Sequence, residues 1–270
     1  MSDQIKVQGV VLSAMPIGEY DRRIVLLTRE RGKISAFARG ARRMGSPFLA
    51  AASPFVFGTF TLYEGRSSYS LVQVNVNRQF MELTTDAGVY YGYYFLEIAD
   101  YFGHEGTDEK EMLNLLYVSF LALLRPSIDN RLVRCIFEFR TIVEQGMMPQ
   151  IFSCASCGKK TDEETGWCFS QNAHGLICPD CRRRFCGSGD VNGDGTSRAD
   201  MVHISPAAVY TMQVIASAPV KKLYGFRVSD EILRELERHI HTCLERSTDR
   251  KFKSLQILKS MLPSTADTKE

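Results

Sequence analysis

Apolar and polar residues alternate in short runs along the first 80 residues, which is the pattern of strands with one buried face. The runs cover residues 5–12, 23–28, 34–38, 55–63 and 68–76. Five short strands in about 80 residues suit a small closed barrel, and the nucleic-acid-binding OB-type barrel has this strand count. Residues 1–80 are therefore expected to form an OB-type domain.

From residue 81 onward the apolar spacing changes to the helical period. Thr107, Asp129, Ser205 and Ser229 stand where helices should begin, because their side-chain oxygens accept hydrogen bonds from the free N–H groups of a first turn. The expected helices cover residues 86–102, 108–125, 130–145, 207–217, 231–246 and a short stretch from residue 252. We expect residues 81–150 and 201–262 to form one α-helical domain, with a polar tail at 263–270. The fold class is therefore predicted to be α+β.

Two cysteine pairs interrupt the helical pattern. Each is a Cys-x2-Cys motif, and the pairs consist of Cys154 with Cys157 and Cys178 with Cys181. Two residues between thiols let a tight turn present both sulfurs to one ion, and two such turns complete a tetrahedron. We predict one structural Zn2+ per chain, because four sulfur ligands leave no coordination position for water. The alternative is two unrelated pairs or disulfides.

A glycine- and aspartate-rich stretch follows the second pair. Asp190, Asn192, Asp194 and Gly195 fit the start of a calcium-binding loop, but Met201 stands where such a loop needs a glutamate. This pattern favours a mobile linker over a calcium site. Residues 151–200 are therefore predicted to be a zinc finger and linker inserted into the helical domain.

Composition narrows the class of protein. Of the 270 residues 44% are hydrophobic and 24% charged, as in ordinary globular proteins. We find no run of about 18 apolar residues that would span a membrane, and the start at Met1 lacks the basic-then-apolar layout of a signal peptide. The eight cysteines then indicate metal binding and reduced thiols rather than disulfides. We expect a cytoplasmic protein.

Charge is distributed unevenly. Residues 1–80 hold 11 Lys/Arg against 5 Asp/Glu, whereas residues 81–150 hold 5 against 11. A basic segment of this kind predicts a polyanionic partner, although solvated surface cations are the alternative. The candidate phosphate contacts are Arg22, Arg23, Lys33, Arg39, Arg42 and Arg43. Phe37 and Tyr69 are candidates for stacking on bases, but aromatic residues in strands more often face the core, and we favour the core.

Catalytic motifs are absent from the sequence. There is no Walker A pattern, no Gly-x-Gly-x-x-Gly after a strand and no Gly-x-Ser-x-Gly. We therefore expect a binding protein with no catalytic residues. Two alternatives remain: a zinc-ribbon and OB protein that binds RNA in translation or transcription, and a zinc hydrolase. The hydrolase needs an open coordination position, which four cysteines do not leave.

The order of a basic barrel, a helical domain and an inserted four-cysteine finger resembles the RecO family of bacterial recombination mediators, over nearly the whole chain. The matching motifs are Gly18-Glu19-Tyr20-Asp21, Leu27-Thr28 with Gly32-Lys33, Ala38-Arg39-Gly40-Ala41-Arg42-Arg43, Phe137-Glu138 with Gly146 and Pro149, and Lys253-Ser254. The resemblance implies a nucleoid-associated DNA repair protein that binds single- and double-stranded DNA through the barrel and anneals complementary strands. It also implies that the protein acts with RecR and single-strand-binding protein to load RecA.

The resemblance further implies a binding site for the acidic C-terminal tail of single-strand-binding protein. That tail ends in an apolar residue with a free carboxylate, so its receptor needs an apolar pocket beside a cation. Within the acidic middle segment, the helix predicted at residues 130–145 alone supplies several arginines, namely Arg131, Arg134 and Arg140. The alternative is that these arginines only offset Glu138 and Glu144.

Overall fold

The computed structural model describes residues 4–66, 68–85, 87–161, 166–187 and 200–261. Internal contacts divide the chain into two compact units, Met1–Pro126 with Phe252–Glu270 and Ser127–Lys251. The predicted helical domain of residues 81–150 and 201–262 is divided between the two units. Its limits therefore remain a prediction. Among the described residues, no helix has both the length and the apolar character needed to cross a membrane.

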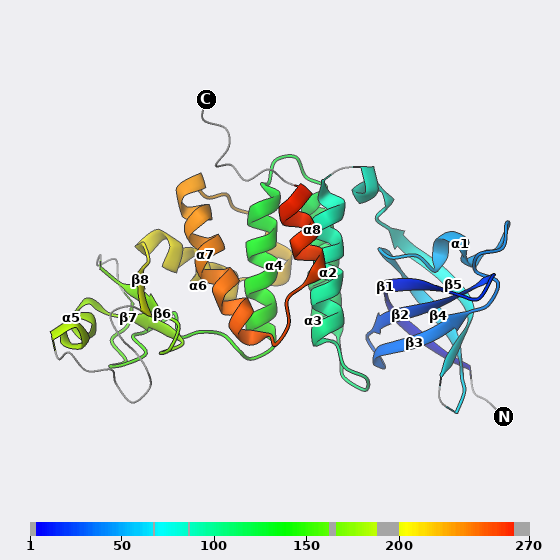
Figure 1. Ribbon diagram of the computed structural model, residues 1–270, viewed down its shortest axis with the longest axis horizontal. Helices are drawn as coiled ribbons and strands as arrows, with labels where there is room; N and C mark the ends of the chain where they lie inside the picture. Colours follow the sequence, from blue (N-terminus) through cyan, green and yellow to red (C-terminus); the bar gives the residue numbers. More distant parts are fainter. Residues whose placement is uncertain (1–3, 67, 86, 162–165, 188–199, 262–270) are drawn as a thin grey trace. The chain divides into compact units, whose positions relative to one another are not determined.

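The first unit contains a closed five-stranded barrel with the strand order β1-β2-β3-β5-β4 (Figure 1). Its neighbouring strands are antiparallel except for the parallel pair of β3 and β5. The strands are β1 (Gln4–Ile17), β2 (Asp21–Thr28), β3 (Gly32–Ala38), β4 (Val56–Glu64) and β5 (Tyr69–Gln79). The five predicted strands and the OB-type barrel are confirmed, and β1 extends beyond the predicted end at Leu12.

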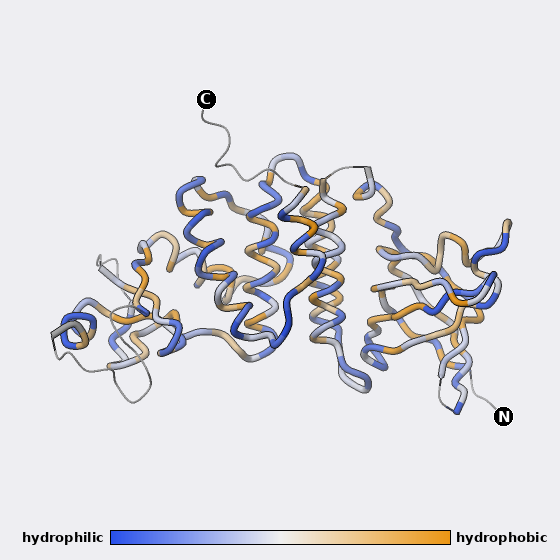
Figure 2. Tube along the Cα trace, in the orientation of Figure 1, coloured by the Kyte–Doolittle hydropathy of each residue, from blue (hydrophilic) through white to orange (hydrophobic). Residues whose placement is uncertain are grey.

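Hydrophobic and hydrophilic residues are interspersed along the barrel strands (Figure 2), and their period-2 alternation explains which side chains fill the barrel. On β2 the barrel core includes Ile24 and Leu26, and on β3 it includes Ile34, Ala36 and Ala38, whereas Leu27 at the end of β2 is buried outside this cluster. The residues between them must point outward, because successive side chains of a strand leave opposite faces. The same alternation that builds the apolar core thus places Arg23, Lys33 and Phe37 on the outer surface of β2 and β3.

Helices complete the first unit. They are α1 (Phe48–Ala51), a 3-10 turn at Met81–Thr85, α2 (Gly88–Phe102), α3 (Lys110–Leu123) and α8 (Lys253–Met261). The expectation that Thr107 caps α3 is wrong, because Glu109 occupies the N-cap position. The Thr107 hydroxyl instead lies 2.7 Å from the His104 carbonyl and 2.8 Å from the Glu109 carboxylate. Thr107 therefore closes the turn before α3 rather than the helix itself.

The described residues of the second unit form four α-helices and a small sheet. Its elements are α4 (Asn130–Glu144), β6 (Cys168–Ser170), β7 (Gly175–Ile177), α5 (Pro179–Gly187), β8 (Met201–His203), α6 (Pro206–Ser217), a 3-10 turn at Val220–Lys222 and α7 (Asp230–Ser247). Helix α4 packs against α6 and α7, so helices from both sides of the cysteine segment come together in this unit. The strands of the finger were not predicted, because three residues are too few to show a period.

Three predicted helix caps of the second unit are confirmed. Asp129 accepts a hydrogen bond from the Arg131 backbone N–H at 2.8 Å, and the Ser205 hydroxyl accepts one from Ala208 at 3.2 Å. Ser229 caps α7 in the same way. Each bond satisfies one of the free N–H groups of a first turn. The calcium-like stretch at Asp190–Gly195 lies outside the described residues.

Candidate nucleic-acid interface and metal centre

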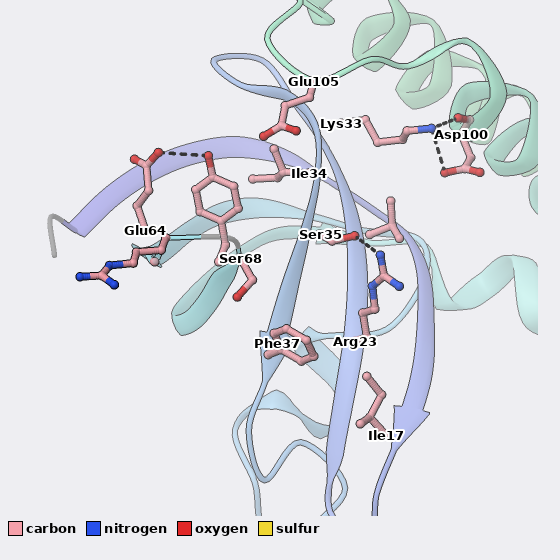
Figure 3. Close-up of a pocket in the computed structure, with 14 residues that line it drawn as sticks. Ile17, Arg23, Lys33, Ile34, Ser35, Phe37, Glu64, Ser68, Asp100 and Glu105 are labelled. Carbon is pink, nitrogen blue, oxygen red and sulfur yellow. Dashed lines mark hydrogen bonds and ion pairs between the residues drawn. The ribbon is translucent and has the colours of Figure 1, made fainter.

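The outer face of β2 and β3 borders a groove of about 850 Å³ (Figure 3). The end of β1, the turn between β4 and β5, Asp100 of α2 and Glu105 complete its lining. This is the face that OB barrels use for oligonucleotides, together with the loops after the first and fourth strands. The groove is lined by Ile17, Arg23, Val25, Lys33, Ile34, Ser35, Phe37, Glu64, Gly65, Arg66, Ser68, Tyr69, Asp100 and Glu105.

Phe37 lies on the surface of this groove. It is 36% exposed, so the expectation that it belongs to the core is wrong. The physical reason is that its neighbours Ala36 and Ala38 are buried, which turns Phe37 outward. Arg23 is its cross-strand partner, and the Arg23 guanidinium donates a 3.1 Å hydrogen bond to the Ser35 hydroxyl. A flat apolar ring and an oriented cation thus lie side by side.

Tyr69 behaves differently from Phe37. It is half-buried against the barrel core, as expected, and its hydroxyl donates a 3.4 Å hydrogen bond to the Glu64 carboxylate. Burial, and then the negative charge of Glu64, raise the pKa of Tyr69. Tyr69 therefore borders the groove as a fixed wall with a protonated hydroxyl.

Lys33 reaches the groove but is held by a helix of the same unit. Its ammonium group donates to the Asp100 carbonyl oxygen and lies 3.6 Å from the Asp100 carboxylate, as Figure 3 shows. Asp100, Glu64 and Glu105 give the groove an acidic side. Its other cations are Arg23 and Arg66, and sequence reasoning missed Arg66. The position of Arg66 in the turn between β4 and β5, where OB barrels border their ligands, is the signal that could have found it.

The segment 39–47, called here the arginine loop, lies against the turn between β1 and β2. The Arg42 backbone N–H donates to the Tyr20 carbonyl at 2.8 Å, and the Arg43 guanidinium lies over the Tyr20 ring, 5.0 Å from its centroid. The Asp21 carboxylate accepts a 2.7 Å hydrogen bond from the N–H of Gly40, whose φ is +64°. These contacts fix the loop while the side chains of Arg39, Arg42 and Arg43 stay exposed.

Arg22 does not line the groove and is held by other parts of the unit. Its guanidinium donates to the Leu49 carbonyl at 2.9 Å and to the Ser53 hydroxyl at 3.1 Å, and the residue is half-buried. The six predicted phosphate contacts therefore occupy three places. Two line the groove, three belong to the arginine loop, and Arg22 holds the segment around α1.

The four predicted metal ligands come together in the second unit. Their sulfur atoms all lie within 4.8 Å of one another, and those of Cys157 and Cys178 are 3.7 Å apart. Tetrahedral coordination at a Zn–S distance of about 2.3 Å puts sulfurs about 3.8 Å apart, so the donor set fits a zinc ion. Cys168 is buried in β6 and does not belong to the four-cysteine cluster.

Local backbone geometry builds the four-cysteine cluster. The N–H of Gly158, whose φ is +75°, donates to the Cys154 carbonyl at 2.9 Å and closes the first turn. The second pair opens α5, where the Arg184 guanidinium lies 2.8 Å from the Cys181 sulfur. Burial raises the pKa of Cys181 to about 12, whereas the Lys159 backbone N–H lowers the pKa of Cys157 to about 7. A cation bound by the four cysteines would overcome the resistance of Cys181 to ionisation, because metal coordination deprotonates thiols.

The three arginines of α4 make ion pairs within the second unit. Arg131 binds Glu237 of α7 at 2.6 Å, and Arg134 binds the same carboxylate at 2.9 Å. Arg140 pairs with Glu144 at 3.0 Å and also donates to carbonyls at the end of α6. The side chains of the three arginines are 22%, 13% and 16% exposed. This geometry supports the alternative in which the arginines offset Glu138 and Glu144, because Arg134 also lies 3.6 Å from the Glu138 carboxylate. The sequence did not predict Glu237, which Arg131 and Arg134 share.

Comparison with known proteins identifies the family. Residues 1–80 match the family model described as Recombination protein O N terminal, and residues 87–256 match Recombination protein O C terminal. The chain belongs to the RecO family. A protein of Symbiobacterium thermophilum named DNA repair protein RecO is 28% identical over 257 residues, which cover 94% of this chain and 96% of the relative. One of the same name from Alkaliphilus metalliredigens is 34% identical over 178 residues, 66% of this chain and 72% of the relative.

RecO membership confirms the resemblance drawn from the short motifs. Two of those motifs, at residues 18–21 and 38–43, prove to be neighbours in space, because the arginine loop lies on the turn between β1 and β2. The structure thus gives a physical reason for their occurring together in one chain: the first motif positions the arginines of the second.

Proposed function

We propose that this RecO-family chain is a DNA repair and recombination protein that binds single-stranded DNA in the groove. The observation that carries the proposal is the exposed Phe37 beside Arg23, on the face that OB barrels use for oligonucleotides. A base can stack on the Phe37 ring while Arg23 holds the neighbouring phosphate. Stacking accepts every base, so binding should depend little on sequence.

The charges of the groove define the path of the strand. Arg23 and Arg66 attract the phosphate backbone, whereas Glu64, Asp100 and Glu105 repel it. The backbone should therefore avoid the acidic side and continue from Arg23 toward the arginine loop. Arg39, Arg42 and Arg43 then serve double-stranded DNA as well, because they contact phosphates rather than bases.

The test of the groove is DNA binding by Phe37→Ala. Loss of one stacked base should weaken binding by about 1–3 kcal/mol, or roughly 5- to 150-fold. Tyr63→Ala is the matched control, because Tyr63 is an aromatic residue 41% exposed on β4 that does not line the groove. Fluorescence anisotropy with a labelled oligonucleotide measures both. Equal affinities of Phe37→Ala and the parent would exclude this groove.

RNA is the alternative ligand for such a barrel. A protein that binds RNA specifically recognises the 2′-hydroxyl, which DNA lacks. We therefore expect matched DNA and RNA oligonucleotides of the same sequence to compete about equally, or DNA to compete better. A preference for RNA of tenfold or more would favour the role in translation or transcription.

Family membership supports a wider role for the chain. We propose that it anneals complementary strands and acts with RecR and single-strand-binding protein to load RecA, as a mediator rather than an enzyme. The direct experiment is annealing of complementary strands that are already coated with single-strand-binding protein. Acceleration of annealing in that assay would support the mediator role, and no acceleration would contradict it.

The tail of single-strand-binding protein is proposed to bind near the start of α4. A pocket of about 260 Å³ lies there, lined by apolar residues such as Leu132 and Leu233 and by Arg227. Asp230 also lines it and pairs with Arg131 at 2.9 Å. An incoming carboxylate would have to compete with Asp230 and Glu237 for the arginines of α4. Binding should therefore become tighter when one of these acids is neutralised.

Zinc is the metal proposed for the four-cysteine cluster. The sulfur distances fit tetrahedral coordination, and thiolates favour zinc among the abundant divalent cations. The ion would hold the turn after Cys154 to the first turn of α5. A site with four thiolates is saturated, so the ion stabilises the finger and does not activate water.

A further inference from the structure

A second hollow of the first unit lies on a different side of the barrel. It has a volume of about 400 Å³ and shares no residue with the groove. Strands β1, β4 and β5, the turn after β2 and helix α3 surround it. This cleft is lined by Gln8, Gly9, Arg29, Phe57, Gly58, Asn77, Arg78, Lys110, Leu113, Asn114 and Tyr117.

Bare backbone forms part of the cleft. Gly9 of β1 and Gly58 of β4 are cross-strand partners. A Cβ atom on Gly9 would lie 2.2 Å from the Leu27 carbonyl oxygen, and one on Gly58 would lie 2.6 Å from that of Asn75. No larger residue fits at either position without moving the strands. The two glycines thus let neighbouring strands of the barrel approach closely, and both line the cleft without placing a side chain in it.

The charged residues that line the cleft are all cations. Arg29, Arg78 and Lys110 line it, and none of the described residues that line it is acidic. Arg78 is held in place by Glu82, at 2.6 Å, and by the ring of Phe80, 5.0 Å below its guanidinium. This contrasts with the groove, where three carboxylates accompany the cations. Three cations without a lining acid suit an anion with several phosphates.

Polar amides and an aromatic ring complete the cleft. Asn77, Asn114 and Gln8 supply side-chain amides, which are common donors to phosphate and sugar oxygens. Tyr117 is 37% exposed, and its ring meets that of Phe57 edge to face at 5.3 Å. The cleft thus combines phosphate-binding cations, amide donors and a ring on which a base can stack, as sites for single-stranded nucleic acids do.

We propose that this cleft binds the phosphodiester backbone of a second polynucleotide strand while the groove holds the first. The inference rests on the proposed function of the groove. Two sites on one unit bring two strands together at a high effective concentration. Annealing would then depend on both sites, whereas binding of one strand would depend mainly on the groove.

The experiment compares Arg29→Gln/Lys110→Gln with the parent chain. The probes are two labelled, non-complementary oligonucleotides of about 10 nucleotides, within the length that one OB barrel covers. The parent should bind both at once. The double variant should bind one, with an affinity for it within about twofold of the parent, and should anneal complementary strands at least about tenfold more slowly. Lys6→Gln/Lys253→Gln is the matched control, because both lysines are exposed and lie outside cleft and groove.

Four results would overturn the inference. The first three are binding of only one oligonucleotide by the parent, unchanged annealing by the double variant, and an equal loss in the control. A fourth is release of the second strand by millimolar inorganic phosphate or ATP but not by unlabelled oligonucleotide, which would make the cleft a site for small phosphates. The variant Arg23→Ala/Phe37→Ala separates the two proposals. If it binds the first strand as tightly as the parent does, the proposed function of the groove is refuted, whereas the four results above decide on the cleft. Thermal unfolding of each variant verifies that the first unit is intact.

Discussion

Arg23 on β2 and Phe37 on β3 lie directly opposite each other, with both side chains on the outer face of the barrel. This pair combines the two elements of sequence-independent binding to a single strand, a phosphate contact and a stacking platform. Neighbours fix both members: Arg23 donates to Ser35, and the backbone of Phe37 is held between two ladders, with β2 and β5. The site is therefore formed before DNA arrives, which lowers the entropic cost of binding.

The arginine loop should contribute to the salt dependence of binding. Arg39→Ala/Arg42→Ala/Arg43→Ala removes up to three phosphate contacts, and each lost contact should lower the slope of log K against log salt by about 0.7 for single strands. Titrations at several salt concentrations measure the slope. Arg22→Ala is the comparison, because Arg22 contacts Leu49 and Ser53 instead. Arg22→Ala should lower the melting temperature and leave the salt slope unchanged. A slope reduced as much as in the triple variant would instead show that Arg22 contacts DNA.

Asp100 should weaken DNA binding in the parent chain. Its carboxylate lines the groove and lies 3.6 Å from the ammonium group of Lys33. Asp100→Asn removes the repulsion and frees the charge of Lys33, so affinity should rise about two- to fivefold, with a larger gain at low salt. Glu111→Gln, an exposed acid at the start of α3, serves as the control for loss of one negative charge. Weaker binding by Asp100→Asn would show that Lys33 acts only when Asp100 holds it.

The four-cysteine cluster should determine the stability of the second unit. Cys157→Ser should reduce the zinc content from about one ion per chain to near zero and lower the melting temperature, because metal binding of this type is folding free energy. The first unit should still bind DNA. Cys168→Ser is the matched control, since Cys168 lies in the same finger outside the cluster. A parent purified without chelators that contains no zinc would refute the metal assignment.

Substitution of Glu237 should destabilise the second unit. Two partly buried arginines share its carboxylate, and its side chain is 22% exposed. Glu237→Gln leaves Arg131 and Arg134 short of negative charge, which should lower the free energy of unfolding by about 1–3 kcal/mol. Arg234→Ala breaks an exposed ion pair with Asp230 and should change stability little. Urea denaturation compares the two, and equal effects would contradict the special position of Glu237.

Local patterns predicted the parts of the structure that depend on local physics. The strands of the barrel follow from period-2 alternation, three caps from single residues before helices, and the cysteine turns from two-residue spacings. The general preference of strand aromatic residues for the core assigns Phe37 wrongly. Its alternation with the buried Ala36 and Ala38 places it correctly on the outer face.

Long-range partners could not be predicted in the same way. Arg22 and Arg23 are adjacent and equally basic, yet the carbonyl that Arg22 reaches belongs to Leu49. The pairing of Arg131 with Glu237 joins residues 106 positions apart, and no spacing rule connects them. Such contacts depend on how helices and loops pack. The sequence therefore indicates where cations stand but not which of them are bonded to other groups of the protein.

The last prediction concerns the tail of single-strand-binding protein, and it uses effects of opposite sign. If the tail carboxylate binds the arginines of α4, Glu237→Gln removes an internal competitor and should raise the affinity for a tail peptide. Arg134→Gln removes a cation and should lower that affinity about tenfold, or 1.4 kcal/mol. If the arginines only stabilise the fold, both variants should lose stability and neither should change peptide binding, because no tail touches them. Isothermal titration with the peptide at a temperature where both variants remain folded decides between the two, and a change of the same sign in both would contradict binding at α4.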